Sequence, residues 1–125
     1  MNVVDTSGWI EFFTEGTNAT VFGEAIADLD RLIVPSITLL EVFEFVLRRK
    51  DETSAVQVIA SMRQGQVIDL DGELALLAGK FGVDHGLPLA DSVIYATAQR
   101  SGAVVWTQDS DFQDLPDVKY LAPEA

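Results

Sequence analysis

The sequence contains no cysteine and a single histidine, His85, among its 125 residues. Without cysteine the chain has no disulfide, no thiolate zinc site and no cysteine nucleophile, which fits a reducing compartment. The histidine lies in the segment DHGLP, which is typical of a turn, and we interpret it as a solvated or locally bonded loop residue. Any catalytic or metal chemistry is therefore expected to rest on other side chains.

Basic residues and long apolar runs are also scarce. Lys and Arg total 8 against 20 Asp and Glu, which gives a net charge of −12 at pH 7. Such an excess disfavours broad electrostatic binding to nucleic acid or to anionic membranes and favours cations and basic partner segments. No apolar run reaches the ~18 residues of a membrane span, and the N-terminal MNVVDTSGW lacks a signal-like pattern. The simplest expectation is a cytoplasmic protein without a membrane partner.

The length and the hydrophobic content of 48% predict one domain, residues 1–125, with a single core. Short runs rich in Val and Ile, without strict polar alternation, are typical of strands covered on both faces. Five such runs occur: Asn2–Val4, Leu32–Val34, Val67–Ile68, Ala103–Trp106 and Val118–Leu121.

Helical patterns separate these strands. Two sets of apolar residues recur with spacings of three and four and form single stripes: Ala55, Val58, Ile59 and Met62, then Leu74, Leu77, Ala78 and Phe81. The segments Leu39–Leu47 and Leu89–Gln99 are apolar almost all round, so we expect both to be buried, with Pro88 opening the second. The alternation predicts a three-layer α/β domain with a mostly parallel five-stranded sheet.

Acidic residues lie where these elements meet. Asp5 follows the first strand, and Asp109 and Asp111 follow the fourth, in VVWTQDSDF. Glu41 and Asp91 are each expected in the first turn of a helix. Because functional groups of an open parallel sheet gather at the carboxyl ends of its strands, we expect these carboxylates to converge.

Converging carboxylates need protons or a cation. Two of them ~4 Å apart repel by roughly 4 kcal/mol at an effective dielectric of about 20. Either some pKa values rise, or a cation lies between the groups. Hard oxygen ligands without clustered Cys or His select Mg²⁺ or Mn²⁺, and an acid-walled site for such ions commonly performs phosphoryl chemistry.

Each acid also has a structural interpretation. Glu41 stands three residues after Thr38, which is a capping-box spacing. Asp91 in a first helical turn suits the helix dipole, and Asp5 and Asp109 suit N-caps or turns. A surface turn accounts equally for Asp111. The coincidence of full carboxylates at all these positions, where Ser or Asn would serve as caps, favours the functional interpretation.

Other polar groups are weaker candidates. Ser7 and Thr107 each stand two residues from an acid and serve equally well as supports of a metal-bound water or as caps. Glu44 lies on roughly the same helix face as Glu41 and is a weaker candidate. The one basic cluster is interpreted as a solvated helix end that is also the best candidate for contacting a phosphate backbone: Arg48, Arg49 and Lys50.

The combined pattern resembles the PIN-domain nucleases, specifically VapC-type toxins of toxin–antitoxin pairs. The matching segments cover nearly the whole chain in order: VVDTSGWIEFF, PSITLLEVFEFVLRR, HGLPLADSVIYATAQRSGAVVWTQDSDF and VKYL. The block from residue 85 to 112 is the most specific, with an acid at a helix start and then Thr-x-Asp-x-Asp-Phe after the next strand.

The resemblance implies a PIN-like α/β/α fold and an Mg²⁺- or Mn²⁺-dependent endoribonuclease that cuts RNA with metal-activated water. Carried over by position, the site comprises Asp5, Glu41, Asp91 and Asp109, with Asp111 as an added ligand or supporting group. The resemblance also implies a homodimer and a cognate VapB-like antitoxin, which would form a hetero-oligomer by wrapping the toxin with an apolar helix. Such an antitoxin can place a basic side chain in the acidic pocket.

Two other classes compete with this interpretation. The first is a non-catalytic PIN-like scaffold that dimerises and binds a protein partner, against which the full set of carboxylates argues. The second is another aspartate-based α/β protein. Haloacid dehalogenase-type phosphatases need a second Asp where this chain has Ser7, and response-regulator receivers need an acidic pair where Asp5 stands alone.

Overall fold

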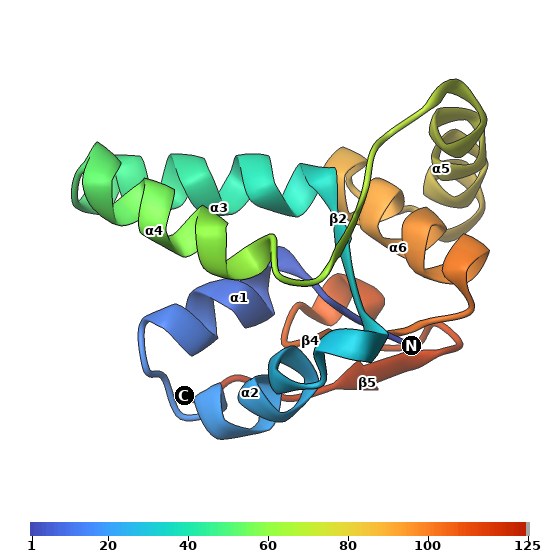
Figure 1. Ribbon diagram of the computed structural model, residues 1–125. Helices are drawn as coiled ribbons and strands as arrows, with labels where there is room; N and C mark the ends of the chain where they lie inside the picture. Colours follow the sequence, from blue (N-terminus) through green and yellow to red (C-terminus); the bar gives the residue numbers. More distant parts are fainter. Residues whose placement is uncertain (125) are drawn as a thin grey trace.

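The computed structural model describes residues 1–124 and alternates strands with helices (Figure 1). The strands are β1 (Asn2–Val4), β2 (Leu32–Pro35), β3 (Gln66–Ile68), β4 (Val104–Thr107) and β5 (Val118–Tyr120). The α-helices are α1 (Thr6–Phe13), α2 (Ala19–Ala27), α3 (Ser36–Arg49), α4 (Glu52–Met62), α5 (Gly72–His85) and α6 (Leu89–Ser101). Short 3₁₀ turns, η1 (Leu29–Arg31) and η2 (Ser110–Phe112), precede β2 and follow β4.

All five strands run parallel in the order β3-β2-β1-β4-β5. On the central strand β1, Val3 and Val4 point to opposite faces and are both fully buried. Burial on both faces explains why the strand sequences are apolar without alternation. The predicted parallel α/β sheet is confirmed, with strand ends that differ from the predicted ones by at most one residue.

Helices cover both faces of the sheet. On one face, side chains of α1, α2, α3 and α4 pack with Val4, Leu32 and Val34. On the other face, α6 packs on Val3, Ile33 and Val105. Helix α5 lies outside α6 and packs mainly against it, with Ile68 of β3 at the margin of their shared cluster. Among residues 1–124, no helix combines the length and the apolarity that crossing a membrane would require.

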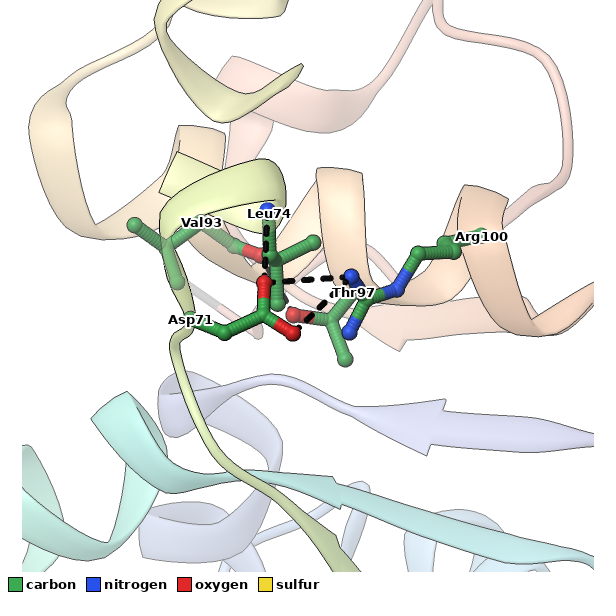
Figure 2. A network of polar contacts seen from close by, with 5 residues as sticks. All are labelled: Asp71, Leu74, Val93, Thr97 and Arg100. Carbon is green, nitrogen blue, oxygen red and sulfur yellow. Dashed lines mark hydrogen bonds and ion pairs between the residues drawn. The ribbon is translucent and has the colours of Figure 1, made fainter. Parts of the chain in front are cut away.

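An ionic and capping contact fixes α5 on α6 (Figure 2). Asp71, the N-cap of α5, accepts a hydrogen bond from the Leu74 N–H at 2.8 Å and pairs with Arg100 of α6 at 3.3 Å. Within α6, the Thr97 hydroxyl donates to the Val93 carbonyl. Residues 92–98 of α6 are all buried, which confirms the centre of the predicted buried segment Leu89–Gln99, whereas Leu89 itself is 85% exposed.

The prediction for residues 39–47 was wrong in two respects. Only Val42 is fully buried there, whereas Leu40 and Leu47 are exposed, because α3 meets the sheet with one face and α4 with another. Glu41 lies in the second turn of α3, because the helix already begins at Ser36. The capping box is absent, since the Thr38 hydroxyl donates to the Pro35 carbonyl instead.

Replacing Gly8 or Gly79 by alanine is expected to change the free energy of unfolding in opposite directions. A Cβ at Gly8 would lie 2.7 Å from both Phe22 and Val4, whereas a Cβ at Gly79 in α5 would meet nothing within 4 Å. We expect Gly8→Ala to lower the free energy of unfolding by about 1–3 kcal/mol through overpacking. Gly79→Ala should raise it by about 0.5–1 kcal/mol through helix propensity. Urea denaturation measures both, and equal effects of the two changes would contradict this account of packing around Gly8.

Candidate active site

The acidic residues gather at the point where the chain's path across the sheet reverses. Strand β1 has β2 on one side and β4 on the other. Asp5 directly follows β1, and Asp109 follows β4 by two residues. The Asp5 N–H donates to the Trp106 carbonyl at 3.1 Å, so these two strand ends are held together. Such a switch point is where open α/β sheets bind their ligands.

Asp5 is the most deeply buried acid of the site, with 2% of its surface exposed. As the N-cap of α1 it accepts the Gly8 N–H at 2.9 Å. The Ser7 hydroxyl donates to it at 2.8 Å and the Thr107 hydroxyl at 2.5 Å. Burial raises the pKa of Asp5 to about 6, and these three donors limit that rise because they stabilise the carboxylate.

The two hydroxyls connect Asp5 to the loop that carries the other acids. The Gln108 N–H donates to Ser7 Oγ at 3.2 Å, and the Asp109 N–H donates to Thr107 Oγ1 at 2.9 Å. Each hydroxyl therefore accepts from the loop backbone and donates to Asp5. The sequence left two roles open for Ser7 and Thr107, as supports of a metal-bound water or as caps. In the structure both hydroxyls orient the Asp5 carboxylate and the loop of Gln108 and Asp109.

Asp91, Asp109 and Asp111 form the compact part of the cluster. One carboxylate oxygen of each lies within 4.8 Å of the other two. Asp91 comes from the first turn of α6, while Asp109 caps η2 by accepting the Asp111 N–H at 2.9 Å. Desolvation raises the pKa of Asp91 to about 8, assisted by the charge of Asp109, a hydrogen bond with Asp109 and the charges of Asp5 and Asp111.

Glu41 is held apart from this compact group. Its Oε1 accepts a hydrogen bond of 2.5 Å from the hydroxyl of Thr6, the first residue of α1. Among the described residues, the candidate metal-holding group does not include Glu41 or Asp5. The contact of Thr6 with Glu41 was not predicted, because the local sequence VVDTS does not show which helix the Thr6 side chain will contact.

The basic cluster stays outside the compact group of Asp91, Asp109 and Asp111, although Arg48 and Arg49 line one surface pocket with Glu41. Arg48 pairs with Glu44 at 3.3 Å, with both side chains exposed, and the Arg49 guanidinium lies over the Phe45 ring. Eight residues separate Glu41 from Arg49, or about 12 Å along α3 at 1.5 Å per residue. Figure 1 shows this end of α3 turned away from the sheet.

His85 also lies outside the acidic cluster. It is the last residue of α5, and its ring packs against those of Phe81 and Tyr95, each with centroids 5.8 Å apart. His85 is thus exposed and packs locally, but it belongs to the end of a helix and not to the loop that the sequence predicted.

The donor set fits a divalent cation that prefers oxygen. Three carboxylates on two elements present oxygens to one point. A cation there would offset the charges of Asp109 and Asp111, which add to desolvation in raising the pKa of Asp91. Asp91, Asp109 and Asp111 would hold such an ion. Asp5 would stand beside it as a buried negative charge.

Comparison with known families agrees with this arrangement. The sequence pattern that defines the PIN domain matches residues 3–118. The chain belongs to the PIN-domain family. None of the curated proteins compared by sequence matches the chain.

Solved structures similar to this PIN domain include components of toxin–antitoxin complexes. A toxin–antitoxin complex from Klebsiella pneumoniae aligns with a TM-score of 0.80 and 22% identity, over 95% of this chain and 96% of that one. VapC20 of Mycobacterium tuberculosis, a toxin that cleaves the sarcin–ricin loop, gives 0.75 and 20%, over 93% and 95%. DNA-bound VapBC of Salmonella typhimurium gives 0.74 and 18%, over 96% of each chain. At these identities the likeness establishes the shared fold.

The acidic cluster predicts an unusual pH dependence of stability. Asp5 and Asp91 have pKa values of about 6 and about 8, above the ordinary 3.8. Between about pH 4 and pH 8 the folded metal-free protein binds more protons than the unfolded chain. Its stability should therefore fall as the pH rises over this range. We expect the Tm of the metal-free protein to fall over this range, and Mn²⁺ to restore it at pH 8.

Asp91→Asn provides the control for this dependence. Because the variant removes the group with the highest pKa of the cluster, its Tm should change less with pH and gain less from Mn²⁺. Calorimetric scans at several pH values measure both effects. A wild-type Tm that changes with pH no more than that of the variant would argue against a repulsive cluster.

Proposed function

We propose that this PIN domain is an Mg²⁺- or Mn²⁺-dependent endoribonuclease, a VapC-type toxin acting in the cytoplasm. PIN domains are generally nucleases. The observation that carries the proposal is the convergence of Asp5, Asp91, Asp109 and Asp111 at the switch point of the sheet. A scaffold that bound only protein would have no use for three carboxylate oxygens within 4.8 Å of one another beside a fourth, buried carboxylate.

The proposed chemistry divides between the cation and the protein. A bound divalent cation supplies positive charge toward the phosphate and activates water for its hydrolysis. Asp91, Asp109 and Asp111 would hold that cation in place. Asp5, through Ser7 and Thr107, would keep the loop of Asp109 in register with β1. Glu41 would present a further carboxylate at the edge of the pocket.

Metal binding can be tested without knowing the RNA target. We expect Asp91→Asn to weaken Mn²⁺ binding at least about tenfold and to abolish cleavage, because it removes one of three converging ligands. The metal-free fold should keep or gain stability at pH 8, since the change relieves repulsion. Isothermal calorimetry with Mn²⁺ and cleavage of single-stranded RNA oligonucleotides of mixed sequence measure the two properties.

Glu24→Gln is the matched control for this experiment. Glu24 is exposed on α2, and its substitution by Gln removes one negative charge, as Asp91→Asn does. Equal Mn²⁺ affinity of Asp91→Asn and Glu24→Gln would show that the cluster is not a metal site. Loss of fold in Asp91→Asn would support the helix-terminal role of this residue instead.

We also propose that the toxin acts as a homodimer held inactive by a cognate VapB-like antitoxin. Similar structures come from toxin–antitoxin complexes. An apolar groove of about 160 Å³ lies between α1, α3 and α4 and suits an apolar helix of such a partner. Its lining includes Ile10, Phe13, Val42, Val46 and Val58. Sedimentation velocity would establish the oligomeric state.

Two valines of α4 provide a test of this groove. Val58 lines it, whereas Val56, two residues earlier, is 54% exposed and outside it. We expect Val58→Glu to prevent co-purification with a co-expressed candidate antitoxin, because it buries a charge in an apolar interface. Val56→Glu should leave the complex intact. The reverse pattern would place the antitoxin elsewhere on the surface.

The net charge of −12 leaves few groups for contacting RNA. Arg48, Arg49 and Lys50 would meet phosphates beyond the cleavage site, at the far end of α3. The same Arg49 and Lys50 line the apolar groove. Loss of RNA affinity in Arg48→Ala/Arg49→Ala, with unchanged Mn²⁺ binding, would support this role.

A further inference from the structure

Thr6 makes a contact unlike those of three other threonines in or beside helices, Thr14, Thr38 and Thr97. The hydroxyls of Thr14, Thr38 and Thr97 each donate to a backbone carbonyl three or four residues earlier. Thr6 is the first residue of α1, so the carbonyls at that distance belong to strand β1. Its hydroxyl instead reaches across to α3 and donates to Glu41 Oε1, 35 residues away in sequence.

The contact is a strong hydrogen bond between two packed helices. Its O···O distance of 2.5 Å lies in the range of hydrogen bonds from a hydroxyl to a carboxylate. Both side chains are partly buried, and α1 packs directly against α3. A glutamate side chain has three rotatable torsions, so this bond selects one of many orientations open to the Glu41 carboxylate.

The donor to Glu41 is neutral, which preserves the charge of the site. Among residues 1–124, ion pairs engage Glu44, Asp71 and Asp84, and Glu41 takes part in none. A lysine or arginine partner would orient the carboxylate but also neutralise it and oppose a cation nearby. A threonine orients it and leaves the full negative charge.

Thr6 also fixes Glu41 relative to Asp5. The peptide bond that joins Asp5 to Thr6 directly follows β1, and the Asp5 side chain and N–H are both hydrogen-bonded. The position of Thr6 is therefore set by the same strand end that sets Asp5. The Thr6–Glu41 hydrogen bond and the peptide bond between Asp5 and Thr6 therefore connect the Glu41 carboxylate to Asp5.

We propose that Thr6 is a positioning residue for cleavage, which acts by orienting the Glu41 carboxylate at the edge of the acidic site. The inference rests on the proposed nuclease function. Because Glu41 lies outside the compact group of Asp91, Asp109 and Asp111, Thr6 governs the rate of cleavage rather than the affinity for metal.

The test compares Thr6→Val, which keeps the shape but loses the hydroxyl, with Thr6→Ser, which keeps the hydroxyl. With mixed-sequence RNA oligonucleotides and saturating Mn²⁺, we expect Thr6→Val to lower kcat about tenfold, as for other supporting groups of metal sites. KM and Mn²⁺ affinity should change less than about threefold, and Thr6→Ser should retain most of the rate. Thr14→Val, on the same helix, controls for loss of a hydroxyl.

A double-mutant cycle shows whether Thr6 acts through Glu41. In the Glu41→Gln background, adding Thr6→Val should lower kcat no further, because the carboxylate to be oriented is already gone. Equal loss of rate in both backgrounds would overturn the inference, as would a wild-type rate in Thr6→Val. Absence of Mn²⁺-dependent cleavage by the wild-type protein would overturn the proposed function itself.

Discussion

The architecture of the site depends on one buried carboxylate. Asp5 ends the central strand with 2% of its surface exposed, where an uncompensated charge would be strongly unfavourable. Its stabilisation requires the first turn of α1 for the Gly8 N–H and the end of β4 for the Thr107 hydroxyl. The same donors that satisfy Asp5 therefore join β1, α1 and the loop of Asp109. Structural capping and site assembly are performed by one side chain, so the two interpretations of Asp5 are compatible.

Repulsion among the acids opposes the stability of the fold. Desolvation, together with the charges of Asp109, Asp5 and Asp111, raises the pKa of Asp91 to about 8, which favours the neutral carboxyl group over the ionised metal ligand in the metal-free state. The surroundings are rigid enough to maintain this arrangement: seven consecutive buried residues of α6 follow Asp91, and the Asp71–Arg100 contact holds α5 against that helix. A locally unfavourable cluster within a consistently packed domain is typical of a functional site.

The sequence was informative where burial is uniform and uninformative where it depends on helix packing. The strands and α6 are covered on both sides, so their sequences are apolar without alternation and can be recognised from the local sequence alone. The exposure of Leu40 and Leu47 was not predictable, because it depends on which faces of α3 are covered by the sheet and by α4. Convergence of Asp5, Asp91 and Asp109 was predictable because strand ends share an edge. The Thr6–Glu41 bond was not, since it depends on the packing of α1 against α3.

Neutral donors explain how an acidic site can be ordered without losing its charge. Asp5 is oriented by two hydroxyls and one N–H, and Glu41 by one hydroxyl. Ammonium or guanidinium partners would give stronger hydrogen bonds, but each would cancel one negative charge and compete with a cation. The ion pairs of residues 1–124 use acids elsewhere on the surface. Serine and threonine at positions 6, 7 and 107 thus order the acidic pocket without adding a positive charge to it.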